Sequence, residues 1–200
     1  MSAAPDGLAA VSRETRAKLN VYLDLLRRWN PAINLVAKGT LADAEQRHVA
    51  DSAQLYRHIP NPAARLVDLG SGGGFPGLVL AILGCRDVHL IESDARKAAF
   101  LREVSRETDT AVTIHPARAE AIAPLDAAIV TARAFAPLAR LLPLARRHLA
   151  PGGQCLLLKG AKAEDELTEA GQSWTMSMQR VPSETDAAGC LLILSSLAPR

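Results

Sequence analysis

The sequence predicts an α/β fold in which a mainly parallel, doubly wound sheet of seven strands follows an N-terminal helical extension. Two observations carry this prediction. After Pro62, short apolar runs alternate with amphipathic helical patterns, which is typical of βαβ units. The first of these runs ends in an acid that is followed at once by a cluster of glycines, and such a sheet opens a nucleotide site in this way.

The N-terminal extension, residues 1–60, is expected to contain two helices. Between residues 12 and 30, apolar residues recur at spacings of three and four, which places them on one face of a helix. These residues are Leu19, Tyr22, Leu23, Leu26 and Trp29. A second helical pattern covers residues 41–58. The following Asn61-Pro62 pair marks a boundary, because a residue before proline avoids the helical region. Residues 61–200 are then expected to form one α/β domain.

The elements of that domain follow from the same alternation. Helices are expected at residues 76–83, 94–107, 137–149 and 162–172. Strands are expected at residues 66–69, 88–92, 112–115, 127–131, 154–159, 176–181 and 190–194. Because no convincing helix separates the last two strands, we expect them to pair as a hairpin at one edge of the sheet.

Composition narrows the class of protein. The 200 residues, 48% of them hydrophobic, supply enough apolar surface for a full core. No window reaches the roughly 18 apolar residues that a membrane span needs, and the N-terminus shows no targeting pattern, so a cytoplasmic protein is expected. The cysteines form no CxxC pair and are odd in number. We therefore expect buried thiols, with no metal site and no disulfide framework.

Charge is distributed unevenly along the chain, although the net charge is only +2. Residues 127–163 contain six basic residues and no acid, and an acidic cluster follows between residues 164 and 169. A basic surface of this kind suits an anionic substrate. An ordinary solvated helix face explains the same pattern equally well.

The segment RLVDLGSGGGFPG at residues 65–77 predicts a cofactor cradle between a strand and a helix. Glycines let the backbone turn tightly and approach a ligand where a β-carbon would collide. Two registers fit the segment. Three glycines satisfy the dinucleotide pattern GxGxxG, namely Gly72, Gly74 and Gly77. Read from Asp68, the pattern is instead DxGxGxG through Gly70, Gly72 and Gly74, which resembles the first motif of S-adenosylmethionine-dependent methyltransferases.

Two acids near the glycines bear on this choice. Glu92 closes the second expected strand, 22 residues after Gly70, where a carboxylate can accept hydrogen bonds from ribose hydroxyls in either class. Asp68 would repel a pyrophosphate but suits a ligand that carries an ammonium and a sulfonium. We therefore favour S-adenosylmethionine as the cofactor.

The chain resembles the bacterial small-subunit ribosomal RNA guanine-N7 methyltransferases over nearly its whole length. The resemblance rests on RRWNPAINLVA, RHVADS, VDLGSGGGFPGLVLAI, LIESDARKAAFLREV, TARAFAPL and LLLKGAKAEDE, which begin at residues 27, 47, 67, 90, 131 and 156. It implies a Rossmann-like class I S-adenosylmethionine methyltransferase fold. It also implies methyl transfer from S-adenosylmethionine to N7 of a guanine in 16S ribosomal RNA, either free or within the small subunit.

The resemblance further implies where the donor binds. Combined with the DxGxGxG register, it assigns the donor to the glycine loop, the acid after the second strand, the loop after the third strand and the arginine of RAFA. These residues are Asp68, Gly70, Gly72, Gly74, Phe75, Glu92, Ala119, Glu120 and Arg133. In the family, the RHVADS segment lies near the mouth of the active site, although His48 and Asp51 could equally form a helix-stabilising pair.

The implied reaction needs no general base, because guanine N7 carries a lone pair and no proton. Positioning of the reactants should therefore dominate catalysis. Lys159, at the end of an apolar strand, is a candidate for binding O6 or a phosphate of the substrate, unless it is a plain surface lysine. Arg96 and Lys97 are further candidates for phosphate contacts. Phe135 is a candidate for stacking on the target base, with a place in the core as the alternative.

Other functions remain open at this stage. A nicotinamide-dependent oxidoreductase would use the GxGxxG register, but both tyrosines lie in the helical extension, so no Tyr-Lys pair is available. A non-catalytic RNA-binding module would keep the fold. A methyltransferase for another RNA or for a small molecule would keep the cofactor. No heptad seam requires a partner, so a monomer is expected.

Overall fold

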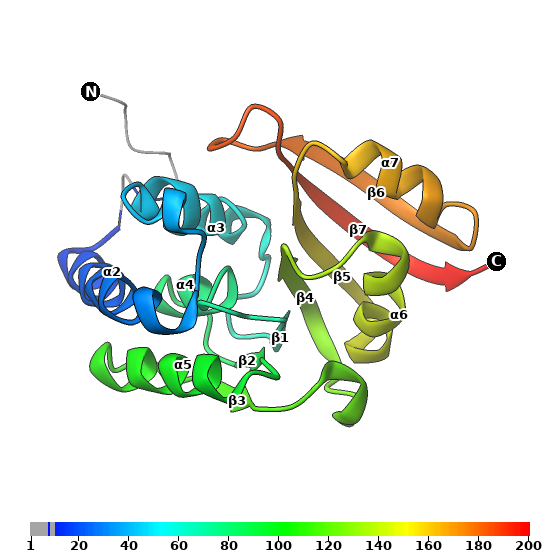
Figure 1. Cartoon of the computed structure of the whole chain (residues 1–200). Helices are drawn as coiled ribbons and strands as arrows, with labels where there is room; N and C mark the ends of the chain where they lie inside the picture. The colour runs from blue at the N-terminus through cyan, green and yellow to red at the C-terminus, as the bar shows by residue number, and fades with distance from the viewer. Residues whose placement is uncertain (1–7, 9–10) are drawn as a thin grey trace.

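A seven-stranded sheet forms the centre of the molecule (Figure 1), in a computed structural model that describes residue 8 and residues 11–200. The strand order is β3-β2-β1-β4-β5-β7-β6. The strands are β1 Leu66–Leu69, β2 Val88–Ile91, β3 Thr113–His115, β4 Ala127–Arg133, β5 Leu149–Lys159, β6 Trp174–Pro182 and β7 Cys190–Pro199. Strands β1 to β5 run parallel, and β7 is antiparallel to both β5 and β6. The predicted sheet and its terminal hairpin are confirmed.

Helices cover both faces of this sheet. They are α2 Arg13–Ile33, α3 Asp51–Ala53, α4 Gly77–Ile82, α5 Ala95–Glu107, α6 Leu138–His148 and α7 Ala163–Ala170. One buried hydrophobic cluster lies under α2, α3, α4 and α5, and a second lies under α6 and α7. Four shorter helical turns are η1 Lys38–Thr40, η2 Glu45–Ala50, η3 Tyr56–His58 and η4 Ala119–Ala121. The arrangement is a three-layer α/β/α sandwich.

The order of the strands reverses at β1. From β1 the chain runs outward to β2 and β3, then returns to place β4 on the other side of β1. The carboxyl ends of β1 and β4 are therefore neighbours, and Asp68 pairs in register with Thr131. In open α/β sheets, ligands bind outside the strand ends at such a reversal.

Helix α2 matches its prediction closely. Ser12 caps it by accepting a hydrogen bond from the Thr15 amide at 3.0 Å. The predicted apolar face is buried except for Trp29, which is half-buried and contacts Phe100 of α5 with tilted rings and 5.7 Å between the ring centroids. The extension therefore shares its core with α4 and α5. The division of the chain at residue 60 stays a prediction.

The prediction of a second helix at residues 41–58 of the extension is wrong in one respect, because the segment is not a regular α-helix. The segment contains the π-helical turn η2, the single turn α3 and the 3₁₀ turn η3. Side chains explain the irregularity, because they bind carbonyls of the segment. Ser52 donates to the carbonyl of His48 at 2.6 Å, and Arg133 of β4 donates to that of Arg47 at 3.2 Å.

Strand β5 starts earlier than the sequence predicts, at Leu149 rather than at residue 154. The Pro151-Gly152-Gly153 sequence is typical of a turn, yet here it lies within a bent strand whose pairing with β4 shifts register. A β-carbon on Gly153 would lie 2.8 Å from the carbonyl oxygen of Ala127. Glycine therefore lets the two backbones approach.

The three cysteines are free and buried, as expected. Within residue 8 and residues 11–200, no helix is long and apolar enough to cross a membrane. The N-terminal stretch in which we expected no targeting pattern falls largely on residues 1–7 and 9–10, which lie outside the described residues.

Replacing Gly77 by alanine should destabilise the fold. The new β-carbon would lie 2.6 Å from Cβ of Asp68 and 2.6 Å from Cδ2 of Leu90. Overpacking of this kind costs about 1–3 kcal/mol, more than alanine gains in a first helical turn. Urea denaturation should show this loss. Gly39→Ala is the matched control, because its β-carbon meets nothing within 4 Å. Equal losses in both variants would contradict the explanation.

Candidate active site

The loop between β1 and α4 adopts a backbone conformation that side chains rarely tolerate. Gly70, Gly72 and Gly74 have φ values of 68°, 55° and 96°. A β-carbon on Gly70 would lie 2.0 Å from Cδ2 of Phe135, and one on Gly74 would lie 2.6 Å from the hydroxyl oxygen of Tyr22. The loop therefore needs glycine both for its shape and for its neighbours.

Glu92 fixes this glycine loop to the start of α5. Its buried carboxylate accepts a hydrogen bond from the Gly72 amide at 2.8 Å through Oε2 and from the Asp94 amide at 2.7 Å through Oε1. A carboxylate oxygen has two acceptor positions. Each oxygen of Glu92 thus keeps one position for a further donor.

Asp68 lies beneath the loop and is completely buried. The hydroxyl of Thr131 donates to its Oδ1 at 2.7 Å, while Oδ2 has no hydrogen-bond partner among the described residues. Burial raises the pKa of Asp68 to about 6, against the opposing effect of hydrogen bonds such as that from Thr131. Its charge can act on a ligand only through the loop.

A cavity of about 460 Å³ opens beside the glycine loop, within the range of small-molecule sites. We call it the glycine-loop cavity. Seven residues predicted to bind the cofactor line it, namely Gly70, Gly72, Phe75, Glu92, Ala119, Glu120 and Arg133. Of the other two predicted residues, Asp68 and Gly74, neither is among the described residues that line it. The structure thus brings together segments from four separate parts of the chain.

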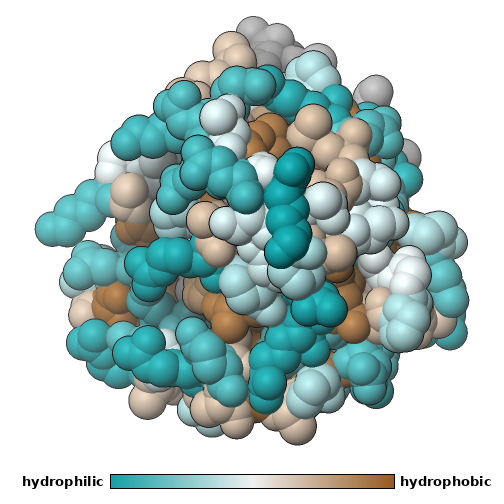
Figure 2. Space-filling view, turned by 90° about the vertical axis from the view of Figure 1, so that its right-hand side faces the viewer, coloured by the Kyte–Doolittle hydropathy of each residue, from teal (hydrophilic) through white to brown (hydrophobic). Residues whose placement is uncertain are grey.

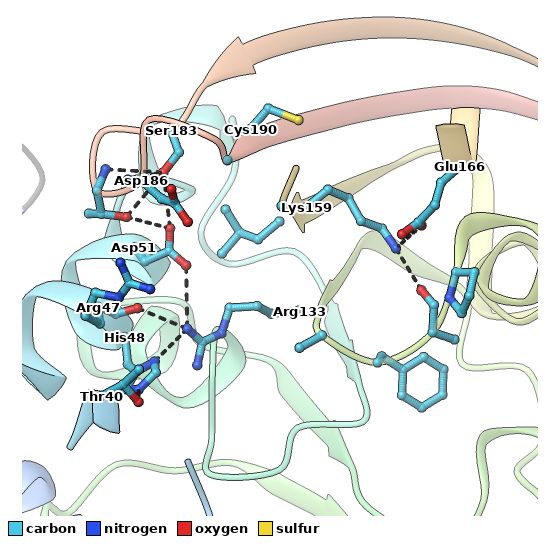
Figure 3. Close-up of a pocket in the computed structure, with 18 residues that line it drawn as sticks. Thr40, Arg47, His48, Asp51, Arg133, Lys159, Glu166, Ser183, Asp186 and Cys190 are labelled. Atoms are coloured by element: carbon cyan, nitrogen blue, oxygen red, sulfur yellow. Dashed lines mark hydrogen bonds and ion pairs between the residues drawn. The ribbon is translucent and has the colours of Figure 1, made fainter. Parts of the chain in front are cut away.

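A second cavity, of about 500 Å³, lies next to the first (Figure 3). We call it the adjacent cavity. It lies between the irregular segment at residues 40–51, the end of β5 and the hairpin loop between β6 and β7. Residues 133–136, which follow directly from β4, line both cavities. This segment is therefore their common wall.

Arg133 is the charged centre of the common wall. Its Nη1 donates to Nδ1 of His48 at 2.8 Å and lies 3.5 Å from Oδ2 of Asp51. Its guanidinium carbon lies 4.9 Å from the centroid of the Phe75 ring, within reach of a cation–π interaction. These contacts compensate a cation whose side chain is only 18% exposed.

His48 accepts the hydrogen bond from Arg133 as a neutral ring. Burial and the nearby Arg133 lower the pKa of His48 to about 3. With Nδ1 as acceptor, the proton lies on Nε2, which is 2.8 Å from Oγ1 of Thr40. The sequence did not predict this series of hydrogen bonds from Arg133 through His48 to Thr40, because Arg133 meets His48 only in the tertiary fold.

The common wall itself is strained. Ala134 has a φ of 50°, a conformation that costs a residue with a β-carbon about 1–2 kcal/mol. The adjoining Phe135 lies over Gly70 and is 39% exposed. The alternative that placed Phe135 in the core is therefore wrong. Its ring borders both cavities.

Lys159 forms an ion pair with Glu166 at the edge of the adjacent cavity, and its predicted contact with the substrate stays a prediction. Its Nζ donates to Oε2 of Glu166 and to the carbonyl oxygen of Ala136, both at 2.7 Å. The same Oε2 accepts from the Leu138 amide at 2.9 Å. The sequence analysis missed Glu166, although a lysine followed seven residues later by an acid at the start of a helix was the available signal. Lys159 still lines the adjacent cavity.

Arg96 and Lys97 occupy different positions at the start of α5. Asp94 caps the helix and accepts hydrogen bonds from both amides, at 2.8 and 3.3 Å. The Arg96 side chain is exposed and forms an ion pair with Asp94 at 3.2 Å, whereas Lys97 lines the glycine-loop cavity. Only Lys97 is therefore placed to contact a ligand there.

Asp51 was not predicted as a site residue, and it joins the hairpin loop to α3. Its Oδ1 accepts from Oγ1 of Thr185 and from Nε2 of Gln54, each at 2.8 Å. The amide of Glu184 donates to Oε1 of Gln54 at 3.1 Å. These bonds connect residues about 130 positions apart, so no local pattern reveals them.

Comparison with known proteins gives a consistent result. A family model described as rRNA small subunit methyltransferase G matches residues 15–189. The ribosomal RNA small subunit methyltransferase G of Rhodospirillum centenum is 60% identical over 95% of this chain and 88% of its own. That of Paramagnetospirillum magneticum is 56% identical over 95% of this chain and 93% of its own.

Solved structures agree on the fold. A TehB-like SAM-dependent methyltransferase from Corynebacterium glutamicum superposes with a TM-score of 0.61 at 14% sequence identity. The match covers 88% of this chain and 98% of the other. At this identity the likeness concerns the architecture alone, and it confirms the predicted methyltransferase-like sheet.

Asp68→Asn should change how stability depends on pH. The pKa of Asp68 is about 6 in the folded chain against an ordinary value of 3.8. Between these values the folded state binds more protons than the unfolded state, so the free energy of unfolding falls as pH rises. The full effect is on the order of 3 kcal/mol.

Because Asp68→Asn lacks this titration, its stability relative to the wild type should rise between about pH 4 and pH 6 and then level off. Urea denaturation at a series of pH values measures the difference. A difference that is independent of pH would show that Asp68 titrates normally.

Proposed function

This chain belongs to the rRNA small subunit methyltransferase G family, and we propose that it transfers a methyl group from S-adenosylmethionine to N7 of a guanine in 16S ribosomal RNA. The observation that carries the proposal is the glycine-loop cavity at the sheet's reversal point, with a second cavity behind a common wall. The glycine-loop cavity suits the methyl donor, and the adjacent cavity suits the base that accepts the methyl group. Family membership argues against the nicotinamide-dependent alternative.

The residues around the glycine-loop cavity fit S-adenosylmethionine. The glycine loop exposes its backbone to the cavity, and Glu92 keeps acceptor positions that suit ribose hydroxyls. Ala119 and Glu120 border the end where we place the adenine, and Arg133 borders the common wall. The buried Asp68 beneath the loop favours a ligand with positive charge. When bound, S-adenosylmethionine supplies an electrophilic methyl group on a sulfonium.

The chain's contribution to the reaction is positioning. Guanine N7 has no proton to lose, so none of the residues in the common wall is required as a base. Holding two reactants in line is worth on the order of 7 to 11 kcal/mol. The network around Arg133 fixes the wall to η2 and to the Phe75 ring, which supports this role.

Phe135 and Lys159 are proposed to act on the RNA. A target base must leave its stack to reach the wall, and aromatic rings stabilise unstacked bases. The exposed ring of Phe135 at the rim of both cavities supports such a contact. Lys159 lies across the adjacent cavity from Arg133 (Figure 3), where it orders the wall through the carbonyl oxygen of Ala136.

The face that carries the C-terminal strands is mainly hydrophilic, with only scattered hydrophobic areas (Figure 2). Large exposed apolar patches mark obligate partners. This one face therefore shows no large apolar interface, which agrees with the proposal that the protein acts as a monomer on RNA.

The first test is transfer of a labelled methyl group from S-adenosylmethionine to small ribosomal subunits from cells that lack this gene. The label should appear at a single guanine, mapped by strand cleavage at N7-methylguanine. Naked 16S RNA is the parallel substrate. Donor binding without any label in RNA would reject the proposal and favour a non-catalytic RNA-binding role or a different acceptor.

Arg133→Ala and Lys159→Ala should affect different steps. Loss of Arg133 should weaken donor binding about tenfold or more, because a charged group is removed from the donor's wall. Lys159→Ala should leave the donor Kd within about twofold but lower RNA methylation at least tenfold. Calorimetry and single-turnover labelling separate the two effects.

Lys162→Ala is the matched control for charge, since Lys162 is an exposed basic residue three positions from Lys159. It should change neither quantity. Unchanged donor affinity in Arg133→Ala, or unchanged labelling in Lys159→Ala, would remove the corresponding assignment. Thermal unfolding of each variant confirms that it is folded.

A further inference from the structure

The adjacent cavity carries two ion pairs on opposite sides, with open space between them. Arg133 and Asp51 lie on one side, and Lys159 and Glu166 lie on the other (Figure 3). The cavity reaches the glycine-loop cavity only across residues 133–136. A flat base held between the two ion pairs would meet a ligand of the glycine-loop cavity at the common wall.

The chemistry of guanine specifies what such a cavity must offer. N7 lies on the major-groove edge, whereas the N1–H and the N2 amino group lie on the pairing edge and are both donors. When N7 faces the wall, these donors point into the cavity. A carboxylate oxygen is the natural partner, because its two acceptor positions can take both hydrogens.

Asp51 meets these requirements better than the other carboxylates of the cavity. Hydrogen bonds from Thr185 and Gln54 to its Oδ1 hold the carboxylate in place. These two bonds fill Oδ1, so Oδ2 is the acceptor that remains for a base, and among the described residues its contact is the longer one of 3.5 Å with Arg133. Since a base contact requires a group that is fixed in advance, this arrangement suits recognition.

The other carboxylates are less suited. Glu166 also has one oxygen filled, since its Oε2 accepts from Lys159 and from the amide of Leu138. Its ion pair, however, is the closer one, at 2.7 Å against 3.5 Å for Asp51. Asp186 is exposed on the hairpin loop, where it accepts a hydrogen bond from the amide of Ala188 at 3.0 Å. Glu166 thus serves to order the wall, and Asp186 is less fixed than Asp51.

We propose that the adjacent cavity is the acceptor-base site and that Asp51 recognises the N1–H and N2 amino edge of the target guanine. This inference rests on the proposed function, because it takes guanine N7 as the methyl acceptor. Asp51 is a specificity residue that contacts the substrate base. The hairpin loop, through Thr185, holds it in position.

The test compares two substrates that differ only in the N2 amino group. Small subunits are reconstituted with 16S RNA that carries guanosine or inosine at the mapped position. The wild type should prefer guanosine in kcat/KM by about 5- to 150-fold, the range expected for a good base contact. In Asp51→Ala this preference should approach one, because both substrates lose the N1–H contact and guanosine also loses the N2 contact, which inosine lacks.

Two control variants separate recognition from structure. Thr185→Val keeps the carboxylate but removes one of the two short bonds that hold its Oδ1, so the preference should fall to a value between those of the wild type and Asp51→Ala. Glu166→Gln alters a second carboxylate of the cavity and should retain the preference even where its overall rate falls. A structural role of Asp51 alone would lower both rates together and leave their ratio unchanged.

Each outcome has a distinct meaning. If the wild type labels neither RNA, the proposed function fails and the inference fails with it. If the wild type labels guanosine RNA but does not discriminate against inosine, or if Asp51→Ala keeps the preference, only the inference is overturned. Loss of the preference in Glu166→Gln instead of Asp51→Ala would also overturn it.

Discussion

The site depends on the burial of one cation, Arg133, in the wall between two cavities. A buried charge is stable only when neighbouring groups compensate its lost hydration. Here the compensation comes from His48, Asp51, the carbonyl of Arg47 and the face of Phe75. These partners belong to the helical extension and to the glycine loop. A single side chain at the end of β4 therefore fixes three parts of the molecule relative to one another.

The helical extension forms part of the site, because its side chains contact the glycine loop. The Tyr22 hydroxyl donates to the carbonyl of Gly73, and its ring stacks on Phe75 with 5.3 Å between centroids. The glycine loop is thus supported from below by α2. The irregular turn at His48 supports it from the side, since the imidazole ring lies 5.2 Å from the Phe75 ring. The loop's conformation is a joint product of sheet and extension.

Local patterns predicted the elements whose causes are local. The spacing of Leu19, Tyr22 and Leu26 predicted α2, and the run from β1 into the glycines predicted the glycine loop, whereas the hydrogen bond from the Gly72 amide to Glu92 was not predicted. The contacts of His48 with Arg133 and of Asp51 with Thr185 could not be predicted in this way, because these partners lie 85 and 134 positions away. A helix was predicted across η2 but not its π-helical form, since a side chain of β4 binds one of its carbonyls. The contacts of the common wall depend on the tertiary fold, whereas the glycine loop could be predicted from the local sequence.

The two cavities also differ in how much of the chain they need. The residues that line the glycine-loop cavity all lie between Leu35 and Leu144, whereas the adjacent cavity takes a wall from the hairpin loop and extends to Cys190. Synthesis proceeds from the N-terminus, so the ribosome delivers every lining residue of the first cavity well before the second can close. The hairpin loop is thus the last component of the site to be synthesised, and the adjacent cavity cannot close before it is present.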